Sequence, residues 1–273
     1  MELSPAWRSE RKTKKLLTMT HREHVRERIG MYLNSAGTYD GWAVRNWNYL
    51  FYCVLHSFGN LASGTDTIHI DLEDGEFTFT ANGMVYFEEV FWFYPALMSS
   101  FSVTQTQEKT VVKFKPDPEI WPNMLFDEQY LAHIMEDYAY LHSSHTIIFR
   151  GQSIKGCLKD LFEKKYGAKG EILEAHKNKV TILLAQTGTG DVRILDYVGG
   201  MRTGGGRHAY ALKKAVKEHF PQIAEAGYDA LLVVNVWSSR DVVIEGSTFN
   251  KVGNISEEYL KDIDNAVKEL KNA

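Results

Sequence analysis

The feature that most constrains the fold is a long apolar helix predicted over residues 42–62. Apolar side chains recur there at steps of three and four residues, which is the period of a helix that buries one face. They are Trp47, Leu50, Phe51, Val54, Leu55, Phe58 and Leu61. Hydrophobic residues make up 44% of the 273-residue chain. A core of ordinary size can therefore form around this helix without disulfides or metals.

Strand and helix patterns surround this helix on both sides. Residues 67–72 and 76–80 alternate around a Glu-Asp-Gly turn, which predicts a hairpin. Gly188, Thr189 and Gly190 predict a second hairpin turn. Further strands are predicted at 110–115, 146–150, 171–176, 179–187, 191–198 and 230–236. Further helices are predicted at 20–29, 127–141 with Asp127 as cap, 154–166, after Gly206 and after Ser256. The pattern indicates a mixed sheet with helices, an α+β fold.

The domain boundary is expected at residues 167–170, which are small, polar and flanked by glycine. The prediction is an N-terminal arm at 1–20, a first domain at 21–168 and a second domain at 169–273. Cys53 and Cys157 lie in apolar segments and are interpreted as two buried free thiols. They offer no C-x-x-C spacing, so no metal site is expected.

Charge limits the classes of partner. The formal net charge of −4 argues against a chain that binds nucleic acid over its whole surface. Two local basic clusters are candidate contacts for DNA or a protein partner, although a solvated helix face is the slightly better explanation of the second. The clusters are Arg11, Lys12, Lys14 and Lys15, and Lys213, Lys214 and Lys217. The N-terminus is basic and polar, without a signal peptide or membrane helix, so we expect a cytoplasmic protein without a membrane partner.

Three stretches together resemble the B subunits of DNA gyrase and topoisomerase IV. Residues 25–33 read V-R-E-R-I-G-M-Y-L, beside the family's V-R-K-R-P-G-M-Y-I. Residues 111–117 read V-V-K-F-K-P-D, and a predicted helix then leads to G-Q-S-I at 151–154. G-G-R-H at 205–208 and E-G-S-T-F-N-K-V-G-N at 245–254 resemble the family's G-G-T-H and E-G-Q-T-K-T-K-L-G-N. The resemblance implies an ATPase domain of the GHKL (Bergerat) type, followed by a transducer domain like ribosomal protein S5 domain 2.

The resemblance also implies where the catalytic groups should lie. The family's general base, a glutamate, falls on Leu50, and its magnesium ligand, an asparagine, falls on Val54. Neither side chain can take a proton or bind a metal ion. A shifted register offers His56 and Asn60, one helical turn apart, for which a capping or surface role is the plainer interpretation.

The family's nucleotide-binding positions have changed as well. Its adenine-binding aspartate falls on Ala81. Of the two glycines that follow, Gly83 is retained and the other falls on Val85. Residues 86–110 contain no glycine for a phosphate-binding lid. The glutamine and lysine of the transducer fall on Ser247 and Phe249. We therefore expect no nucleotide or other cofactor to bind.

The resulting hypothesis is a gyrase B-like protein that has lost ATP binding and hydrolysis. It would act by association with itself as a homodimer, with a topoisomerase subunit, or with DNA. The main alternative is a divergent ATPase subunit that binds ATP and magnesium, uses His56 and Asn60, and works with a separate cleavage subunit. A DNA-binding or regulatory module that shares only the fold is the third hypothesis.

Overall fold

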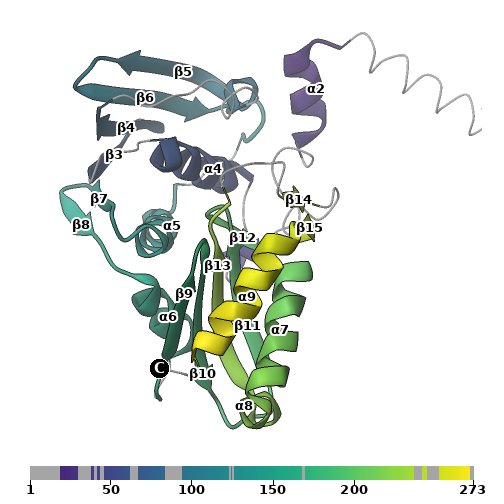
Figure 1. The fold of residues 1–273 in the computed structure, drawn as a ribbon. Coiled ribbons are helices and arrows are strands. Elements are labelled where there is room, and N and C mark those ends of the chain that lie inside the picture. Colours follow the sequence, from purple (N-terminus) through teal and green to yellow (C-terminus); the bar gives the residue numbers. More distant parts are fainter. Residues whose placement is uncertain are drawn as a thin grey trace, which may run out of the picture. The chain divides into compact units, whose positions relative to one another are not determined.

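The structure is a computed structural model. It describes residues 19–29, 38–39, 42–43, 46–61, 67–83, 94–122, 124, 126–167, 170–236, 242–244 and 252–270 (Figure 1). The chain divides into two compact units. The first comprises Met1–Leu131 and Ile148–Gln152, and the second comprises Ala132–Ile147 and Ser153–Ala273. The domain bounds inferred from the sequence stay a prediction.

The first unit contains the predicted short helix, α2 (His21–Glu27). Thr20 and Glu23 form a capping box, in which each side chain bonds the backbone N–H of the other residue. Further along α2, the Arg26 guanidinium donates to the Ala96 carbonyl at 2.9 Å and pairs with the buried Asp117 carboxylate. These bonds hold α2 beside the short 3-10 helix η1 (Tyr94–Leu97).

A six-stranded sheet forms around the predicted hairpin. Its strand order is β5-β6-β4-β3-β7-β8. The strands are β3 (Thr67–Glu73), β4 (Glu76–Asn82), β5 (Met98–Gln105), β6 (Lys109–Pro116), β7 (Thr146–Phe149) and β8 (Gln152–Ile154). The hairpin β3–β4 is confirmed, and its turn residues Asp74 and Gly75 both have positive φ. Strand β5 was not predicted, because most of its residues are polar and exposed, and only Phe101 and Val103 alternate with them.

Helix α4 (Asn46–Leu61) is the long apolar helix expected from the sequence. It begins four residues later than predicted, because Trp42–Ala43 instead forms the short strand β2 against β1 (Thr38–Tyr39). Phe51 packs on Phe77 and Phe79 of the β3–β4 hairpin, with ring centroids 4.9 and 5.5 Å apart. This aromatic packing joins the helix to the sheet.

Helix α5 (Glu128–Leu141) begins at the predicted cap. The Asp127 carboxylate accepts from the backbone N–H groups of Gln129 and Tyr130, at 3.0 and 3.2 Å. Helix α6 (Leu158–Tyr166) begins four residues later than predicted, because residue 154 ends strand β8. Cys53 is buried as expected. Cys157 is exposed at the start of α6, so the prediction of a second buried thiol is wrong.

The second unit has a mixed five-stranded sheet. Its order is β12-β11-β13-β10-β9, with β11 and β13 parallel and the other pairs antiparallel. The strands are β9 (Leu173–Lys177), β10 (Val180–Gln186), β11 (Val192–Val198), β12 (Met201–Thr203) and β13 (Tyr228–Val234). The predicted hairpin at Gly188–Gly190 is wrong, because β13 lies between β10 and β11. The connection instead bonds the start of β13, where the Tyr228 N–H donates to the Asp191 carbonyl.

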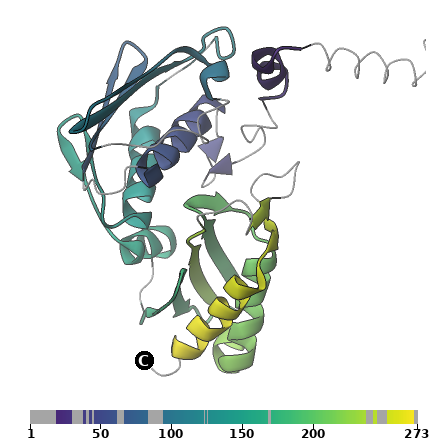
Figure 2. The ribbon, with the colours of Figure 1, turned by 45° about the horizontal axis from the view of Figure 1, so that its top comes forward.

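Helices cover both faces of this second sheet. Helix α6 packs on one face through Leu161 and Phe162. Helices α7 (Arg207–His219) and α9 (Glu257–Leu270) pack on the other face and lie side by side in Figures 1 and 2. Helix α8 (Pro221–Ala226) and the strand pair β14 (Val242–Ile244) and β15 (Val252–Ile255) also belong to this unit. No helix in the described ranges is long and apolar enough to span a membrane.

Candidate functional site

The positions that the resemblance assigns to the general base and the magnesium ligand lie inside the core. Leu50 and Val54 are one turn apart on α4, and both are 0% exposed. The seven consecutive residues 50–56 are all buried. Seven residues make almost two helical turns, so every side of α4 is covered over this length. An apolar side chain at each of the two positions is stable in these surroundings, whereas a charged one would lose its hydration.

The positions assigned to adenine binding lie at the end of β4. Ala81 is 1% exposed and offers no polar atom in its side chain. Gly83 has a φ of +81° and is bonded to the neighbouring strand β6. Its N–H donates to the Glu108 carbonyl, and its carbonyl accepts from the Thr110 hydroxyl, both at 2.7 Å. Gly83 therefore has a structural role here as a turn residue.

The alternative pair on α4 is only partly described. The His56 side chain is 2% exposed, and its ring centroid lies 4.2 Å from that of Tyr52. A general base must reach the water that it activates, and this ring is enclosed by the core. Asn60 belongs to α4, but its side chain lies outside the described part of the structure. Val85, Ser247 and Phe249 also lie outside it.

The glycine-rich turn before α7 surrounds a buried carboxylate that the sequence analysis missed. Asp196 Oδ2 accepts from the Gly205 N–H at 3.1 Å, lies 2.6 Å from His208 Nε2, and bonds the Thr203 hydroxyl. Asp196 is 4% exposed and His208 is 0% exposed. The carboxylate therefore joins β11 to the turn before α7 and to the His208 side chain of α7. The only sequence signal was a lone aspartate within an apolar strand.

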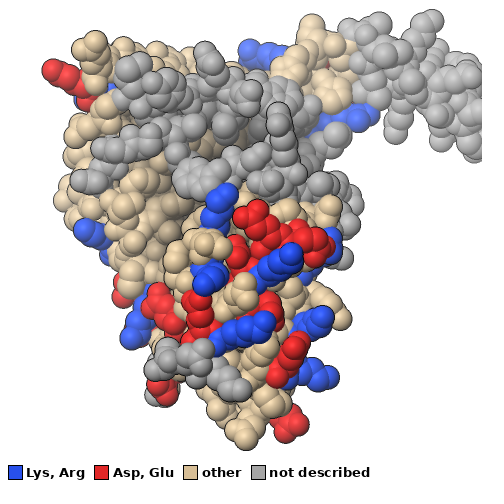
Figure 3. Space-filling view, in the orientation of Figure 1, with Lys and Arg blue, Asp and Glu red and all other residues tan. Residues whose placement is uncertain are grey.

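The predicted lysine cluster on α7 is exposed but is not part of a uniformly basic surface. Lys213, Lys214 and Lys217 all face solvent. A groove of about 760 Å³ runs between α7 and α9, and its lining includes Lys214 together with Glu218 and Asp264. Positive and negative side chains are interspersed on this face (Figure 3). The other predicted cluster, Arg11, Lys12, Lys14 and Lys15, lies outside the described residues.

His142, which follows α5, is largely buried. A histidine cation would suit the C-terminal end of a helix, where His142 and His145 lie. Burial, with a smaller contribution from His145, instead lowers the pKa of His142 to about 4. The ring lies 4.5 Å from that of Tyr138, whose hydroxyl bonds His145 Nδ1 at 2.7 Å. His142 is therefore neutral at pH 7.

We expect His142 to make the protein less stable in mild acid. Its pKa is lower in the folded protein than the ordinary value of about 6.5 in the unfolded chain. The unfolded chain therefore binds more protons between pH 6.5 and pH 4, and the free energy of unfolding falls as the pH drops through this window. Between pH 7.5 and pH 5 the loss is about 2 kcal/mol. Urea unfolding of the native chain and of His142→Phe at both pH values measures it.

A control separates this effect from the titration of other histidines. His176 is exposed on β9, so His176→Gln should keep the pH dependence of the native chain. His142→Phe should lose about 2 kcal/mol of that dependence, because phenylalanine carries no titrating group. Equal pH dependence in the native chain and in His142→Phe would show that His142 remains able to ionise in the folded state.

The fold of this chain is similar to those of several solved structures. Comparisons with models of protein families and with curated protein sequences found no match. The 43K ATPase domain of Thermus thermophilus gyrase B aligns with a TM-score of 0.63 at 20% identity, over 91% of this chain and 88% of that one. The Francisella tularensis topoisomerase IV ATP-binding domain aligns with a TM-score of 0.63 at 15% identity, over 91% of this chain and 90% of that one.

A third solved structure shows the same fold. The ATPase and transducer domains of Balamuthia mandrillaris DNA topoisomerase II align with a TM-score of 0.64 at 13% identity, over 93% of this chain and 96% of that one. The similarity covers both units of the chain rather than one. Identities at this level establish the fold alone. The chain therefore has the GHKL ATPase-and-transducer fold found in type II topoisomerases.

Proposed function

We propose that this chain is a gyrase B-like protein that neither binds nor hydrolyses ATP and that acts by association. The observation that carries the proposal is the complete burial of Leu50 and Val54 on α4. In the resemblance to gyrase B these two positions belong to the general base and the magnesium ligand. We also propose that 21–168 and 169–273 are its two domains and that it acts in the cytoplasm.

The energetics of burial support this proposal. A fully buried leucine or valine stabilises the fold by about 1.5–3 kcal/mol relative to an exposed one. A carboxylate at the same place would need a bound cation or donors to offset its lost hydration. Ala81, at the position of the adenine-binding aspartate, is 1% exposed and apolar too. Three changes in the same direction are what selection for a packed core, rather than for a nucleotide pocket, would produce.

Titration calorimetry with ATP and magnesium tests the proposal. We expect no saturable binding up to about 1 mM ATP, the upper end of ordinary KM values. A gyrase B ATPase fragment in the same buffer serves as the positive control. Turnover is measured in parallel for the native chain and for His56→Ala, and both should show none. Saturable binding would contradict the proposal, and turnover that disappears in His56→Ala would favour the divergent ATPase instead.

Sedimentation tests the association part of the proposal. The native chain is analysed alone, with a gyrase B ATPase-and-transducer fragment, and with a short DNA duplex at low salt. At least one of the three should show a larger species. For the DNA mixture, a variant with Lys213, Lys214 and Lys217 changed to glutamine should lose the complex if α7 supplies the phosphate contacts. A single monomeric species under all three conditions would contradict association.

A further inference from the structure

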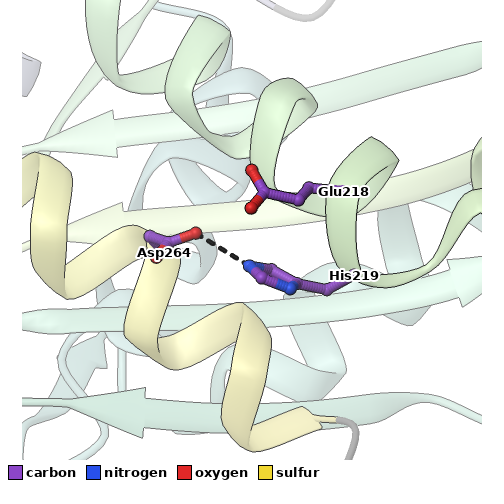
Figure 4. Close-up of side chains that lie close together, drawn as sticks. All are labelled: Glu218, His219 and Asp264. Atoms are coloured by element: carbon purple, nitrogen blue, oxygen red, sulfur yellow. Dashed lines mark hydrogen bonds and ion pairs between the residues drawn. The ribbon is translucent and has the colours of Figure 1, made fainter.

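A cluster of three potential metal ligands lies between α7 and α9. Glu218 and His219 are the last two residues of α7, and Asp264 lies in α9. One ligand atom of each residue lies within 4.8 Å of the other two. The three side chains extend toward the same space, and His219 Nε2 lies 2.9 Å from Asp264 Oδ1 (Figure 4). We propose that Glu218, His219 and Asp264 bind a zinc ion that joins α7 to α9.

The chemistry of the three donors suits zinc. Zinc binds imidazole nitrogen and carboxylate oxygen at about 2.0–2.2 Å, with tetrahedral geometry. Ligand atoms of such a site lie about 3.4 Å apart, so the side chains need to close by about 1 Å. Glu218 and Asp264 also line the 760 Å³ groove, which gives the ion an access path and leaves the fourth position open to water. The two carboxylates can reach the ion without unwinding of α7 or α9.

The local electrostatics favour a cation at this place. The C-terminal end of a helix carries a partial negative charge, and Glu218 and His219 occupy that end of α7. Asp264 adds a carboxylate beside this helix end, with Oδ1 2.9 Å from His219 Nε2 and Oδ2 2.6 Å from Lys268 Nζ. The Glu218 side chain is exposed and adds a second carboxylate next to His219 and Asp264.

Lys268 is the competitor of the ion. Its Nζ lies 2.6 Å from Asp264 Oδ2, four residues earlier on α9. The ammonium competes with zinc for this carboxylate, because the two cations repel each other. Replacing Lys268 with methionine keeps the apolar part of the side chain and removes the competing charge. The Lys268→Met variant should therefore bind zinc more tightly than the native chain, whereas a merely structural ion pair predicts no gain.

Titration of the metal-free chain with zinc chloride tests the site. The native chain should bind one zinc ion, and His219→Ala and Asp264→Asn should each weaken binding about tenfold or more. Lys268→Met should tighten it. The matched control His176→Ala removes an exposed histidine of β9, whose Nδ1 lies 2.9 Å from the Thr181 hydroxyl, and it should bind zinc like the native chain. Thermal unfolding without zinc verifies that each variant is folded.

Two results would overturn the site. One is the absence of saturable zinc binding by both the native chain and Lys268→Met. The other is equal affinity in the native chain, His219→Ala and Asp264→Asn, which would place any bound ion elsewhere. The titration is independent of ATP and of any protein partner. Its outcome therefore leaves the proposed loss of ATP binding untouched.

Discussion

A glutamate in place of Leu50 is expected to unfold the first unit rather than to supply a general base. Leu50 is 0% exposed, and the helix around it is buried on every side. A carboxylate there must either lose its hydration or take up a proton at the cost of a raised pKa. We expect Leu50→Glu to lower the free energy of unfolding by more than about 4 kcal/mol, which is a large part of the stability of an ordinary domain.

Urea unfolding followed by circular dichroism measures this loss. Leu50→Met is the matched control, because it conserves volume and apolar character and should cost less than about 1.5 kcal/mol. Stability of Leu50→Glu close to that of Leu50→Met would mean that the position borders water or a cavity. That result would remove the observation on which the proposed function depends. It would also call for ATP titration of the glutamate variant itself.

Alanine in place of Gly206 is expected to disrupt the start of α7. Gly206 has a φ of +137° and a ψ of −160°, a region open essentially to glycine alone. A Cβ atom there would lie 2.2 Å from the Val252 carbonyl oxygen, which belongs to the backbone of β15 and cannot rotate away. The strain and the required backbone shift together should cost about 3 kcal/mol or more.

The control for Gly206 is a glycine with a positive φ and free space. Gly188 has a φ of +73°, and a Cβ atom there would meet nothing within 4 Å. Gly188→Ala should therefore cost only the left-handed backbone penalty of about 1–2 kcal/mol. Urea unfolding of both variants provides the comparison. Similar losses in the two variants would show that the contact with Val252 relaxes easily and that α7 can shift away from β15.

Local patterns predicted most of the elements because their causes are local. Helix α4 follows from apolar residues three and four positions apart, and the β3–β4 turn follows from Asp74-Gly75. Strand β5 was missed because both of its faces are largely exposed, so only Phe101 and Val103 mark an apolar alternation. The hairpin predicted at 188–190 was wrong because turn chemistry does not reveal that a later strand, β13, enters between its two neighbours.

Some candidate site residues could be assigned from the sequence, and others were found only in the structure. The resemblance assigned Leu50, Val54 and Ala81 to lost catalytic and binding positions, and the structure adds that all three are buried. The remaining clusters join residues that are far apart in the chain. Asp196 meets His208 across twelve positions, and His219 meets Asp264 across forty-five. No spacing motif connects such residues, so neither cluster could be found from the sequence.

The sequence by itself determined most of the segments that become helices and strands, and its resemblance to gyrase B assigned Leu50, Val54 and Ala81 to the ATP site. Those properties depend on residue identity and on neighbours a few positions away. Only the tertiary structure decided that β13 separates β10 from β11, that His142 is neutral, and that Gly206 cannot carry a side chain. Each of these depends on which distant backbone or side chain fills the surrounding space, and packing alone sets that.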